Sequence, residues 1–235
     1  MSADERPGVF APRMVVSKMS EAGVFLEALD RHWGRFVAAE AVLELGAGQG
    51  WASCLAKELL GGERRFIVTD VSEEAVQSVT IWERVFDTRI DDTRACPSFD
   101  VDVPDGSVDL VFCFQAAHHF GAHRRTLEEV RRVLRPGGAC LYLHEPTTPG
   151  YLYGPAIKRV NRKRASYSHD VFEDVLVADR LLAIGASLGF RSTRLFAPSL
   201  RARGQKPFLY YTVVRRLGGL QRFVPSTADF IFETA

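Results

Sequence analysis

The chain has 235 residues, of which 46% are hydrophobic and 25% charged, values close to the average of soluble globular domains. This composition excludes a disordered chain, a collagen and a small disulfide scaffold, and the length suffices to bury one large core. The formal net charge of +1 is not the signature of a protein whose whole surface attracts nucleic acid or membranes.

The four cysteines form neither a zinc pattern nor a redox motif, because they are far apart and contain no C-x-x-C pair. The histidine and carboxylate spacings also match no usual zinc pattern, so we expect no metal. Reduced thiols favour a cytoplasmic location. The first ten residues, MSADERPGVF, lack the basic and apolar regions of a secretory signal, and we expect no export. The longest near-apolar run, 108–114, is too short to cross a membrane.

Hydrophobic periodicity predicts helices alternating with strands. Leu26, Leu29, Trp33, Phe36 and Val37 recur at steps of three and four, which predicts an amphipathic helix within an N-terminal extension of residues 1–40. Strands are then expected at 41–45, 66–69, 108–114 and 139–143, with a weaker one near 95–99, and helices at 51–60, after the N-cap Ser72, at about 127–134 and at 179–188.

Two further strand-like runs, 191–196 and 208–214, close the chain without a predicted helix between them, so we expect an antiparallel pair at one edge. The whole pattern predicts an α/β fold with a doubly wound, mostly parallel sheet. Ligands of such sheets bind at the carboxyl ends of the strands. The loops after the predicted strands are therefore the places to search for function.

The first of these loops, 44–50, reads ELGAGQG. Its glycines permit a tight turn and let a ligand approach the backbone beside a helix N-terminus, although a tight turn without a ligand would look similar. Asp70 ends the second strand 20 residues after Gly50, where a carboxylate can accept hydrogen bonds from ribose hydroxyls. Trp51 stands where a dinucleotide fingerprint needs Gly or Ala, which argues against a bound pyrophosphate.

Four segments, VLELGAGQG, VTDVS, VPDGSVDLVFCFQAAHHF and RRVLRPGGACLYLHEP, follow one another over about residues 41–146. In order and spacing they resemble the class I (Rossmann-like) S-adenosylmethionine-dependent methyltransferases, in particular the ubiquinone and menaquinone methyltransferase-like group (type 11). The resemblance implies a seven-stranded sheet with a C-terminal antiparallel strand pair, and S-adenosyl-L-methionine as cofactor. It also divides the chain into the extension 1–40 and a methyltransferase domain 41–235, with an insertion at about 146–180 that covers the acceptor.

The resemblance assigns cofactor-binding roles to residues at the ends of the strands. The glycine-rich loop and its acidic residue would hold the methionine end, Asp70 the ribose, and Val71 the adenine. The segment at Ser98 and Phe99 would also lie near the adenine, and Phe114 and Gln115 would reach the methionine moiety through their backbone. The full set is Glu44, Gly46, Ala47, Gly48, Gly50, Asp70, Val71, Ser98, Phe99, Phe114 and Gln115.

The segment 115–119, QAAHH, replaces the Asn/Asp-Pro-Pro-Tyr signature typical of many nucleic-acid and protein amide N-methyltransferases. We therefore expect a small-molecule acceptor and no nucleic-acid or membrane partner, with oxygen favoured over nitrogen and carbon. A hydroxyl acceptor would benefit from a general base, and His118, His119 and His144 follow the relevant strands. Our hypothesis is that His119 or His144 is that base. The alternative is that the histidine pair only satisfies backbone groups at a helix entry.

Five cations fall within seven residues of the predicted insertion, namely Lys158, Arg159, Arg162, Lys163 and Arg164. They suit an anionic acceptor such as a phosphate- or carboxylate-bearing sugar or metabolite, although a solvated helix face is the commoner meaning of such a run. The same region contains aromatic residues that could form a lid over the reacting centre or pack in the core: Tyr151, Tyr153, Tyr167 and, beside them, His169.

Two other functions stay open at this point. One is a methyltransferase-like module that binds the cofactor without turnover, since a fold and a cofactor site do not establish chemistry. The other is a nicotinamide-dependent oxidoreductase, which Trp51 and the terminal strand pair disfavour. The sequence leaves the oligomeric state undetermined.

Overall fold

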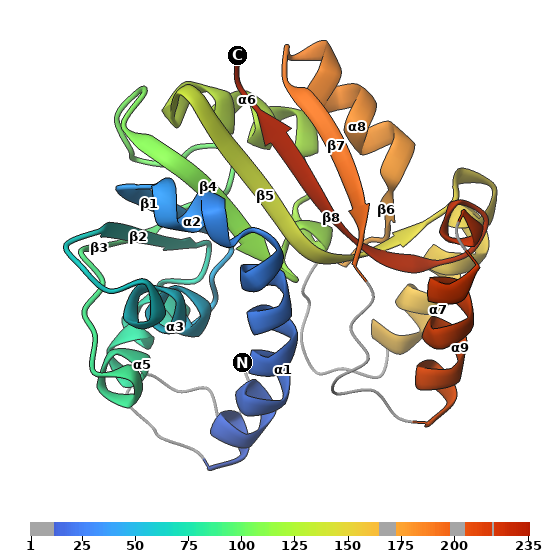
Figure 1. The fold of residues 1–235 in the computed structure, drawn as a ribbon, viewed down its shortest axis with the longest axis horizontal. Coiled ribbons are helices and arrows are strands. Elements are labelled where there is room, and N and C mark those ends of the chain that lie inside the picture. Colours follow the sequence, from blue (N-terminus) through green and yellow to red (C-terminus); the bar gives the residue numbers. More distant parts are fainter. Residues whose placement is uncertain (1–11, 165–172, 198–204, 218) are drawn as a thin grey trace.

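The computed structural model describes residues 12–164, 173–197, 205–217 and 219–235. Figure 1 shows a central twisted sheet with helices on both faces. The strand order is β3-β2-β1-β4-β5-β8-β7, and β6 pairs with β5 outside this row. The strands are β1 Ala41–Leu45, β2 Arg65–Asp70, β3 Asp92–Ala95, β4 Val108–Phe114, β5 Leu134–Thr148, β6 Leu176–Val177, β7 Arg191–Phe196 and β8 Ser226–Glu233.

The sheet is parallel from β3 through to β5, whereas β8 runs antiparallel to both of its neighbours, β5 and β7. From β1 the chain adds β2 and β3 on one side and then returns to add β4 and β5 on the other. Such a reversal is the point at which open α/β sheets bind ligands. The predicted fold, a mostly parallel sheet with a C-terminal antiparallel pair, is confirmed.

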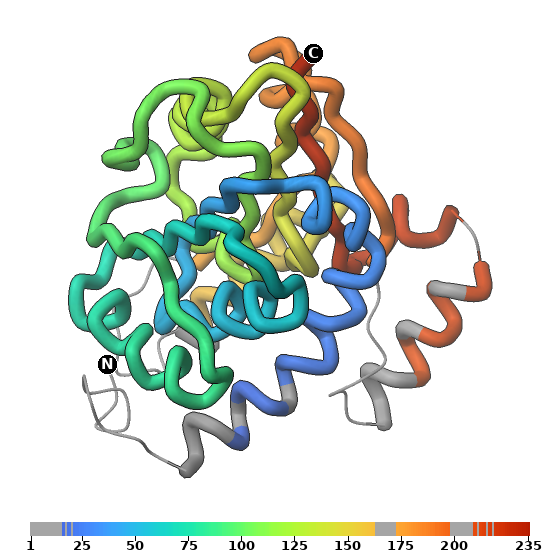
Figure 2. The backbone as a smooth tube through the Cα atoms, turned by 60° about the vertical axis from the view of Figure 1, so that its left-hand side comes forward, coloured from blue at the N-terminus to red at the C-terminus, as the bar shows by residue number. Residues whose placement is uncertain are grey.

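Helices cover the two faces of the sheet in separate groups. One face is covered by α1 Pro12–Arg31, α2 Trp33–Ala38, α3 Trp51–Leu60 and α5 Val79–Phe86, and the other by α6 His123–Val133 and α8 Ala178–Ser187. Successive side chains of a strand alternate between these two apolar layers, as Val42 and Leu43 do in β1. The structure also contains α4 Glu73–Gln77, α7 Tyr153–Arg164 and α9 Gln205–Arg216, the last of which projects from the body of the molecule (Figure 2). No helix within the described ranges has both the length and the apolar character that a membrane span requires.

Local signals in the sequence account for several element boundaries. The Ser72 hydroxyl accepts a hydrogen bond from the Ala75 amide at 3.2 Å and caps α4, as predicted. The first turn of α4 carries Glu73 and Glu74, where carboxylates complement the helix dipole. The predicted helix near 127–134 ends one residue earlier, because Leu134 already pairs with Val108 in the sheet.

The prediction for the second C-terminal strand is wrong. Residues 208–214 belong to α9, and the strand that pairs with β7 is β8, so a helix does lie between the two strands. The run FLYYTVV is rich in aromatic and β-branched residues, and a short apolar run of this kind does not distinguish a strand from a helix. Conversely, Ser226 and Asp229 interrupt the apolar pattern of β8, although both are buried.

The first predicted helix is two helices, with a break at His32 between α1 and α2. Leu29 and Phe36 are buried as expected, whereas Leu26, Trp33 and Val37 are 38%, 41% and 42% exposed. These three side chains are therefore not part of the core. The weaker strand expected near 95–99 is displaced, since β3 ends at Ala95.

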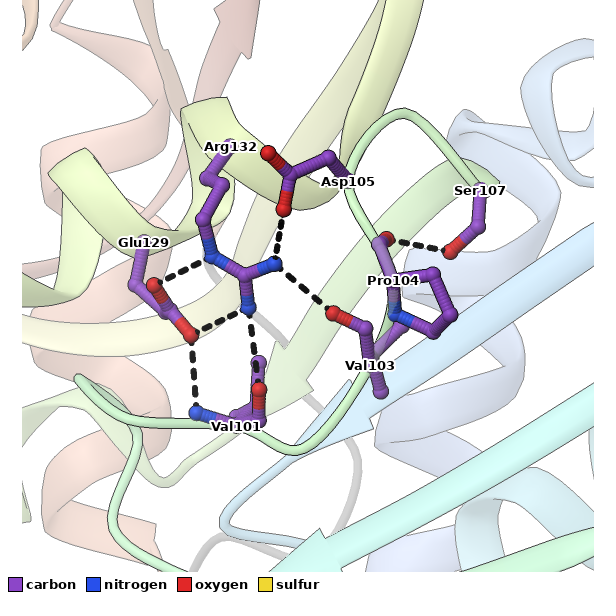
Figure 3. A network of polar contacts seen from close by, with 7 residues as sticks. All are labelled: Val101, Val103, Pro104, Asp105, Ser107, Glu129 and Arg132. Atoms are coloured by element: carbon purple, nitrogen blue, oxygen red, sulfur yellow. Dashed lines mark hydrogen bonds and ion pairs between the residues drawn. The ribbon is translucent and has the colours of Figure 1, made fainter.

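Arg132 on α6 holds the segment between β3 and β4 in place (Figure 3). Its guanidinium donates hydrogen bonds to the carbonyl oxygens of Val101 and Val103 at 2.9 and 2.8 Å. It also pairs with the carboxylates of Glu129 and Asp105, and Glu129 accepts a further bond from the Val101 amide at 2.9 Å. This network fixes the entry into β4, the strand that leads to the candidate site.

Candidate active site

The loop between β1 and α3 forms an open cradle. Gly46, Gly48 and Gly50 have φ angles of 62°, 55° and 71°, a left-handed conformation that glycine adopts without strain. A Cβ atom would lie 2.9 Å from Phe120 if added to Gly46 and 2.8 Å from Val79 if added to Gly50, so these two glycines pack against protein. At Gly48 no atom lies within 4 Å of the Cβ position. The backbone there is accessible to a ligand.

Asp70 connects this cradle to the next loop. One carboxylate oxygen accepts a hydrogen bond from the Gly48 amide at 2.8 Å, and the other accepts from the Ser72 amide at 2.9 Å. The structure therefore brings together the residue predicted to bind the ribose and the loop predicted to hold the methionine end. The side chain of Val71, the predicted neighbour of the adenine, is 77% exposed next to them.

Glu44 is buried beneath the cradle. Its Oε2 accepts hydrogen bonds from the Ser53 hydroxyl at 2.5 Å and from the Ser53 amide at 3.2 Å. Burial raises the pKa of Glu44 to about 8, although the Ser53 hydrogen bonds oppose this rise. At neutral pH this carboxyl is therefore largely protonated, and it anchors the first turn of α3.

An aromatic cluster packs in the core next to the start of α3. Phe25 from α1, Trp51 from α3 and Phe114 from β4 contact one another edge-on, with ring centroids 5.1 to 5.7 Å apart. Lys18 on α1 lies with its Nζ 6.0 Å from the Trp51 ring centroid. Helix α1, within the predicted N-terminal extension, thus packs against the first residue of α3 and the last residue of β4.

Two residues near the candidate site adopt left-handed backbone conformations that are uncommon for residues other than glycine. They are Gln115, directly after β4, with a φ angle of 51°, and His144, within β5, with 54°. The Gln115 amide donates to the carbonyl of Leu143 at 3.0 Å, which extends the pairing of β4 with β5 by one residue. Such local strain is concentrated at functional sites.

Glu145 organises the loop that follows β4. Its Oε1 accepts hydrogen bonds from the amides of Ala116 and Ala117, both at 2.8 Å. Its Oε2 lies 2.9 Å from Nδ1 of His118, a residue of the short helix η2 Ala117–His119. The carboxylate is fully buried, so it both fixes the loop and orients the imidazole. A carboxylate that holds one ring nitrogen of histidine leaves the other free for proton transfer.

The two histidines predicted as candidate bases occupy different environments. His119 is exposed, and its ring centroid lies 4.1 Å from that of His118. His144 is 5% exposed, and its ring stacks on Phe114 with a centroid distance of 6.4 Å. The sequence hypothesis did not select His118. The sequence signal for it is Glu145, the acidic residue directly after His144, which binds residues of the segment 115–119, here called the histidine loop.

Asp229, which the sequence analysis missed together with β8, fixes the backbone at His144. Its Oδ1 accepts a hydrogen bond from the His144 amide at 2.8 Å, where the β5–β8 register shifts. Its Oδ2 accepts from Arg31 at 2.9 Å and lies 3.0 Å from Nε2 of His32. Burial alone would raise the pKa of Asp229, but these polar contacts lower it below the ordinary value.

Ser98 and Phe99, predicted near the adenine, contact α6. The Ser98 and Thr126 hydroxyl oxygens are 2.9 Å apart, and the Arg125 guanidinium lies 4.1 Å from the Phe99 ring centroid. Their role in cofactor binding stays a prediction.

The predicted covering segment contains the helix α7. Lys158, Arg159 and Arg162 are exposed on it. Tyr151 and Tyr153 contact other segments of the chain. The Tyr151 hydroxyl donates a hydrogen bond to the Phe223 carbonyl, and the Tyr153 hydroxyl donates one to the Asp174 carboxylate at 3.0 Å. Tyr167 and His169 lie outside the described residues. Over the parts of the chain that the structure describes, no group of three or more His, Cys, Asp or Glu side chains could hold a metal ion.

Comparison with known proteins identifies the domain. Residues 43–142 match the family profile described as a methyltransferase domain, type 11. These residues form a methyltransferase domain. Domains of this group use S-adenosylmethionine, so the predictions of the family and of its cofactor are confirmed.

Several solved structures share the fold of this chain at low sequence identity. Geranyl diphosphate C-methyltransferase from Streptomyces coelicolor A3(2) has a TM-score of 0.62 and 14% identity, with 83% of this chain and 73% of that chain covered. That structure contains S-adenosyl-L-homocysteine. The [4+2]-cyclase SpnF has a TM-score of 0.58 and 16% identity, with 83% and 74% covered.

The sequence relatives match over less than half of this chain. Lovastatin diketide synthase mokB of Monascus pilosus is 36% identical over 107 residues, which are 41% of this chain and 4% of the synthase. A protein of Mycolicibacterium smegmatis, named as a probable S-adenosylmethionine-dependent methyltransferase, is 35% identical over 100 residues, which are 43% of this chain and 36% of that protein. The chain thus spans only a minor part of the length of these relatives.

Proposed function

We propose that the protein transfers a methyl group from S-adenosylmethionine to a small-molecule acceptor, with an oxygen atom favoured. The observation that carries this proposal is the open backbone at Gly48, joined to Asp70 at 2.8 Å within a methyltransferase domain. The cofactor, when bound, supplies an electrophilic methyl group. The protein binds and orients the two reactants and excludes water.

The residues around the cradle suit this cofactor. Gly46, Ala47, Gly48 and Gly50 would hold the methionine end through their backbone, and Asp70 would accept hydrogen bonds from the ribose. Glu44 is neutral while it contacts only Ser53. A ligand ammonium group nearby would favour its ionised form, which would couple binding to loss of a proton. Val71, Ser98 and Phe99 would flank the adenine, and Phe114 and Gln115 would contact the methionine moiety.

For a hydroxyl acceptor we add His118 to the candidate bases His119 and His144. The support is the buried Glu145 carboxylate 2.9 Å from His118 Nδ1, since a histidine that is oriented and charge-stabilised in this way accepts a proton well. His119, beside it, is the more exposed of the pair. His144 would act through its position next to Phe114.

The segment 146–180 is proposed to cover the acceptor. The exposed cations of α7 support an anionic acceptor, and the QAAHH segment after β4 supports a small molecule over a nucleic acid or a protein amide. The absence of a C-x-x-C pair supports the cytoplasmic setting proposed with it.

A module that binds the cofactor without methyl transfer is the alternative. The likeness to SpnF supports this alternative, because SpnF shares the fold and is named as a [4+2]-cyclase and not as a methyltransferase. A nicotinamide-dependent oxidoreductase is less well supported, because Trp51 fills the space beside the N-terminus of α3.

Thermal unfolding with S-adenosylhomocysteine and with NAD tests the cofactor site. A ligand at 100 times its dissociation constant should stabilise the fold by about 2.7 kcal/mol, which is roughly 5–10 °C for a chain of this size. We expect this shift with S-adenosylhomocysteine and its loss in Asp70→Ala. Asp102→Asn is the matched control, because the Asp102 side chain is 92% exposed. A shift with NAD alone would contradict the proposal.

Single alanine variants of the three histidines test the base once an acceptor is found. We expect His118→Ala to lower turnover at saturating acceptor by about 100-fold to 10,000-fold while cofactor affinity stays unchanged. A larger loss of turnover in His119→Ala or His144→Ala than in His118→Ala would assign the base to that residue instead. Full turnover in all three variants would show that the reaction needs no histidine base.

A further inference from the structure

A second cavity, of about 600 Å³, lies where the end of β5 meets α8, β7 and the short helix η4 Leu220–Arg222. A volume of this size suits a small molecule. The lining contains Thr148 from β5, Ser192 and Arg194 from β7, and Arg222 from η4. None of these residues has a role in the cofactor cradle.

The charge of this cavity favours an anion. Arg194 and Arg222 line it, and within the described part of the chain neither side chain has an ion-pair partner. Arg191 on the same strand, by contrast, pairs with Glu233 at 2.6 Å and does not line the cavity. Among the described lining residues the one acid is Asp179. Guanidinium groups bind phosphates and carboxylates through paired hydrogen bonds.

A buried hydroxyl in the cavity wall lacks a partner. Thr148 is 2% exposed, and its Oγ1 has no hydrogen-bond partner among the described residues. Thr147, which also lines the cavity, has its hydroxyl 3.0 Å from that of Ser226. A buried polar atom without a partner is costly, so this part of the cavity wall is not fully satisfied by the described residues.

The N-terminus of α8 adds a third feature. Val177 and Ala178 line the cavity, and the N-cap Val177 makes no side-chain capping hydrogen bond. The first amides of this ten-residue helix and its dipole favour a negative charge at that end.

The cavity is separate from the cofactor cradle. Leu143 pairs with Phe114 at the edge of the cradle, and Thr148 lies five residues further along β5. At about 3.3 Å per residue, the two places are roughly 16 Å apart.

From these observations we infer that the cavity is a second binding site for a small hydroxylated metabolite that carries a phosphate or a carboxylate. Arg194, Arg222 and the α8 N-terminus bind the anionic group, and Asp179 accepts from a ligand hydroxyl.

Titration calorimetry with glucose 6-phosphate, malate, inorganic phosphate and glucose tests this site. We expect glucose 6-phosphate or malate to bind and glucose to fail, and the comparison of the anions separates a phosphate site from a carboxylate site. In the double variant Arg194→Gln/Arg222→Gln the dissociation constant should rise at least about tenfold, which is 1.4 kcal/mol.

Arg191→Gln is the matched control, because it removes a cation from the same strand outside the cavity. It should bind the anion as the wild type does. No binding of any of the three anions, or equal affinity in the double variant, would overturn the inference. The affinity of the double variant for S-adenosylhomocysteine should stay unchanged, so failure of this site is distinguishable from failure of the cofactor site.

Discussion

Three buried carboxylates hold the loops around the candidate active site. Glu44 binds the first turn of α3, Glu145 binds the loop after β4, and Asp229 binds the backbone at His144. Each accepts at least one backbone N–H group from a neighbouring segment. The loops around the site are therefore shaped by hydrogen bonds from backbone amides to buried side chains. Such acids leave only an indirect trace in the sequence, because a carboxylate inside an apolar strand resembles an interruption.

Replacement of Glu44 by glutamine should reduce the pH dependence of stability. The pKa of Glu44 is about 8 in the folded protein against an ordinary value of 4.5, so the folded state binds this proton more tightly than the unfolded state does. The stability contributed by the proton is fully present below pH 4.5 and is lost as the pH rises through about 8. Urea unfolding should therefore show the wild type losing stability relative to Glu44→Gln over this range.

Glu58→Gln provides the comparison, because Glu58 is an exposed acid on the same helix as Ser53. Its pH profile should follow that of the wild type. Parallel profiles of Glu44→Gln and the wild type would contradict the prediction.

At the scale of elements, the sequence predicted well those strands that helices cover on both faces. β1 and β4 are apolar runs interrupted only by Glu44 and Asp109 and followed by unusual residues, and this pattern is typical of central parallel strands. The edge strand β3 alternates between half-buried and exposed positions, and its prediction was displaced. For α9, the composition of 208–214 favoured a strand, and only the tertiary structure distinguishes a strand from a helix in such a short apolar run. The helix α7 was not predicted either.

The packing of α8 against the sheet depends on Gly185. A Cβ atom at this position would lie 2.6 Å from a ring carbon of Phe232 and also collide with Ser192. Gly185→Ala should therefore lower the free energy of unfolding by about 1–3 kcal/mol through overpacking. Denaturant unfolding measures this change.

Gly34 in α2 is the matched control, because no atom lies within 4 Å of its Cβ position. Alanine is the better helix former by about 1 kcal/mol, so Gly34→Ala should stabilise the protein. Equal effects of the two substitutions would show that close packing at Gly185 is unimportant.

At the scale of the whole molecule, residues from both ends of the described chain meet at β8. Arg31 and His32 at the α1–α2 break contact Asp229, and Arg35 pairs with Glu233 at 2.8 Å. Through the His144 amide, Asp229 extends this connection to β5 and the site. The family motifs cover 43–142 and contain none of these β8 contacts, which explains why the sequence did not reveal them.

Asp229→Asn should destabilise the protein by about 3 kcal/mol, the cost of breaking a buried ion pair, or roughly 6–12 °C in melting temperature. The pKa of Asp229 is lowered on folding, so its contribution is present above the ordinary value of 3.8 and is lost as the pH falls further. Calorimetry should find that the difference in melting temperature between the variant and the wild type becomes smaller at acidic pH. In Glu233→Gln, which breaks a more exposed pair on the same strand, the loss should stay below about 1 kcal/mol.

The position of β8 between β5 and β7 has a consequence for synthesis of the protein. A ribosome releases the cradle, the histidine loop and β5 well before residues 226–233, yet β5 lacks its antiparallel partner and the His144 amide lacks its acceptor until then. Domains fold as units during synthesis, and unpaired strand edges are prone to aggregation. While the residues before β8 are being translated, the nascent chain therefore carries an incomplete sheet, and the backbone at His144 gains its acceptor only when β8 emerges.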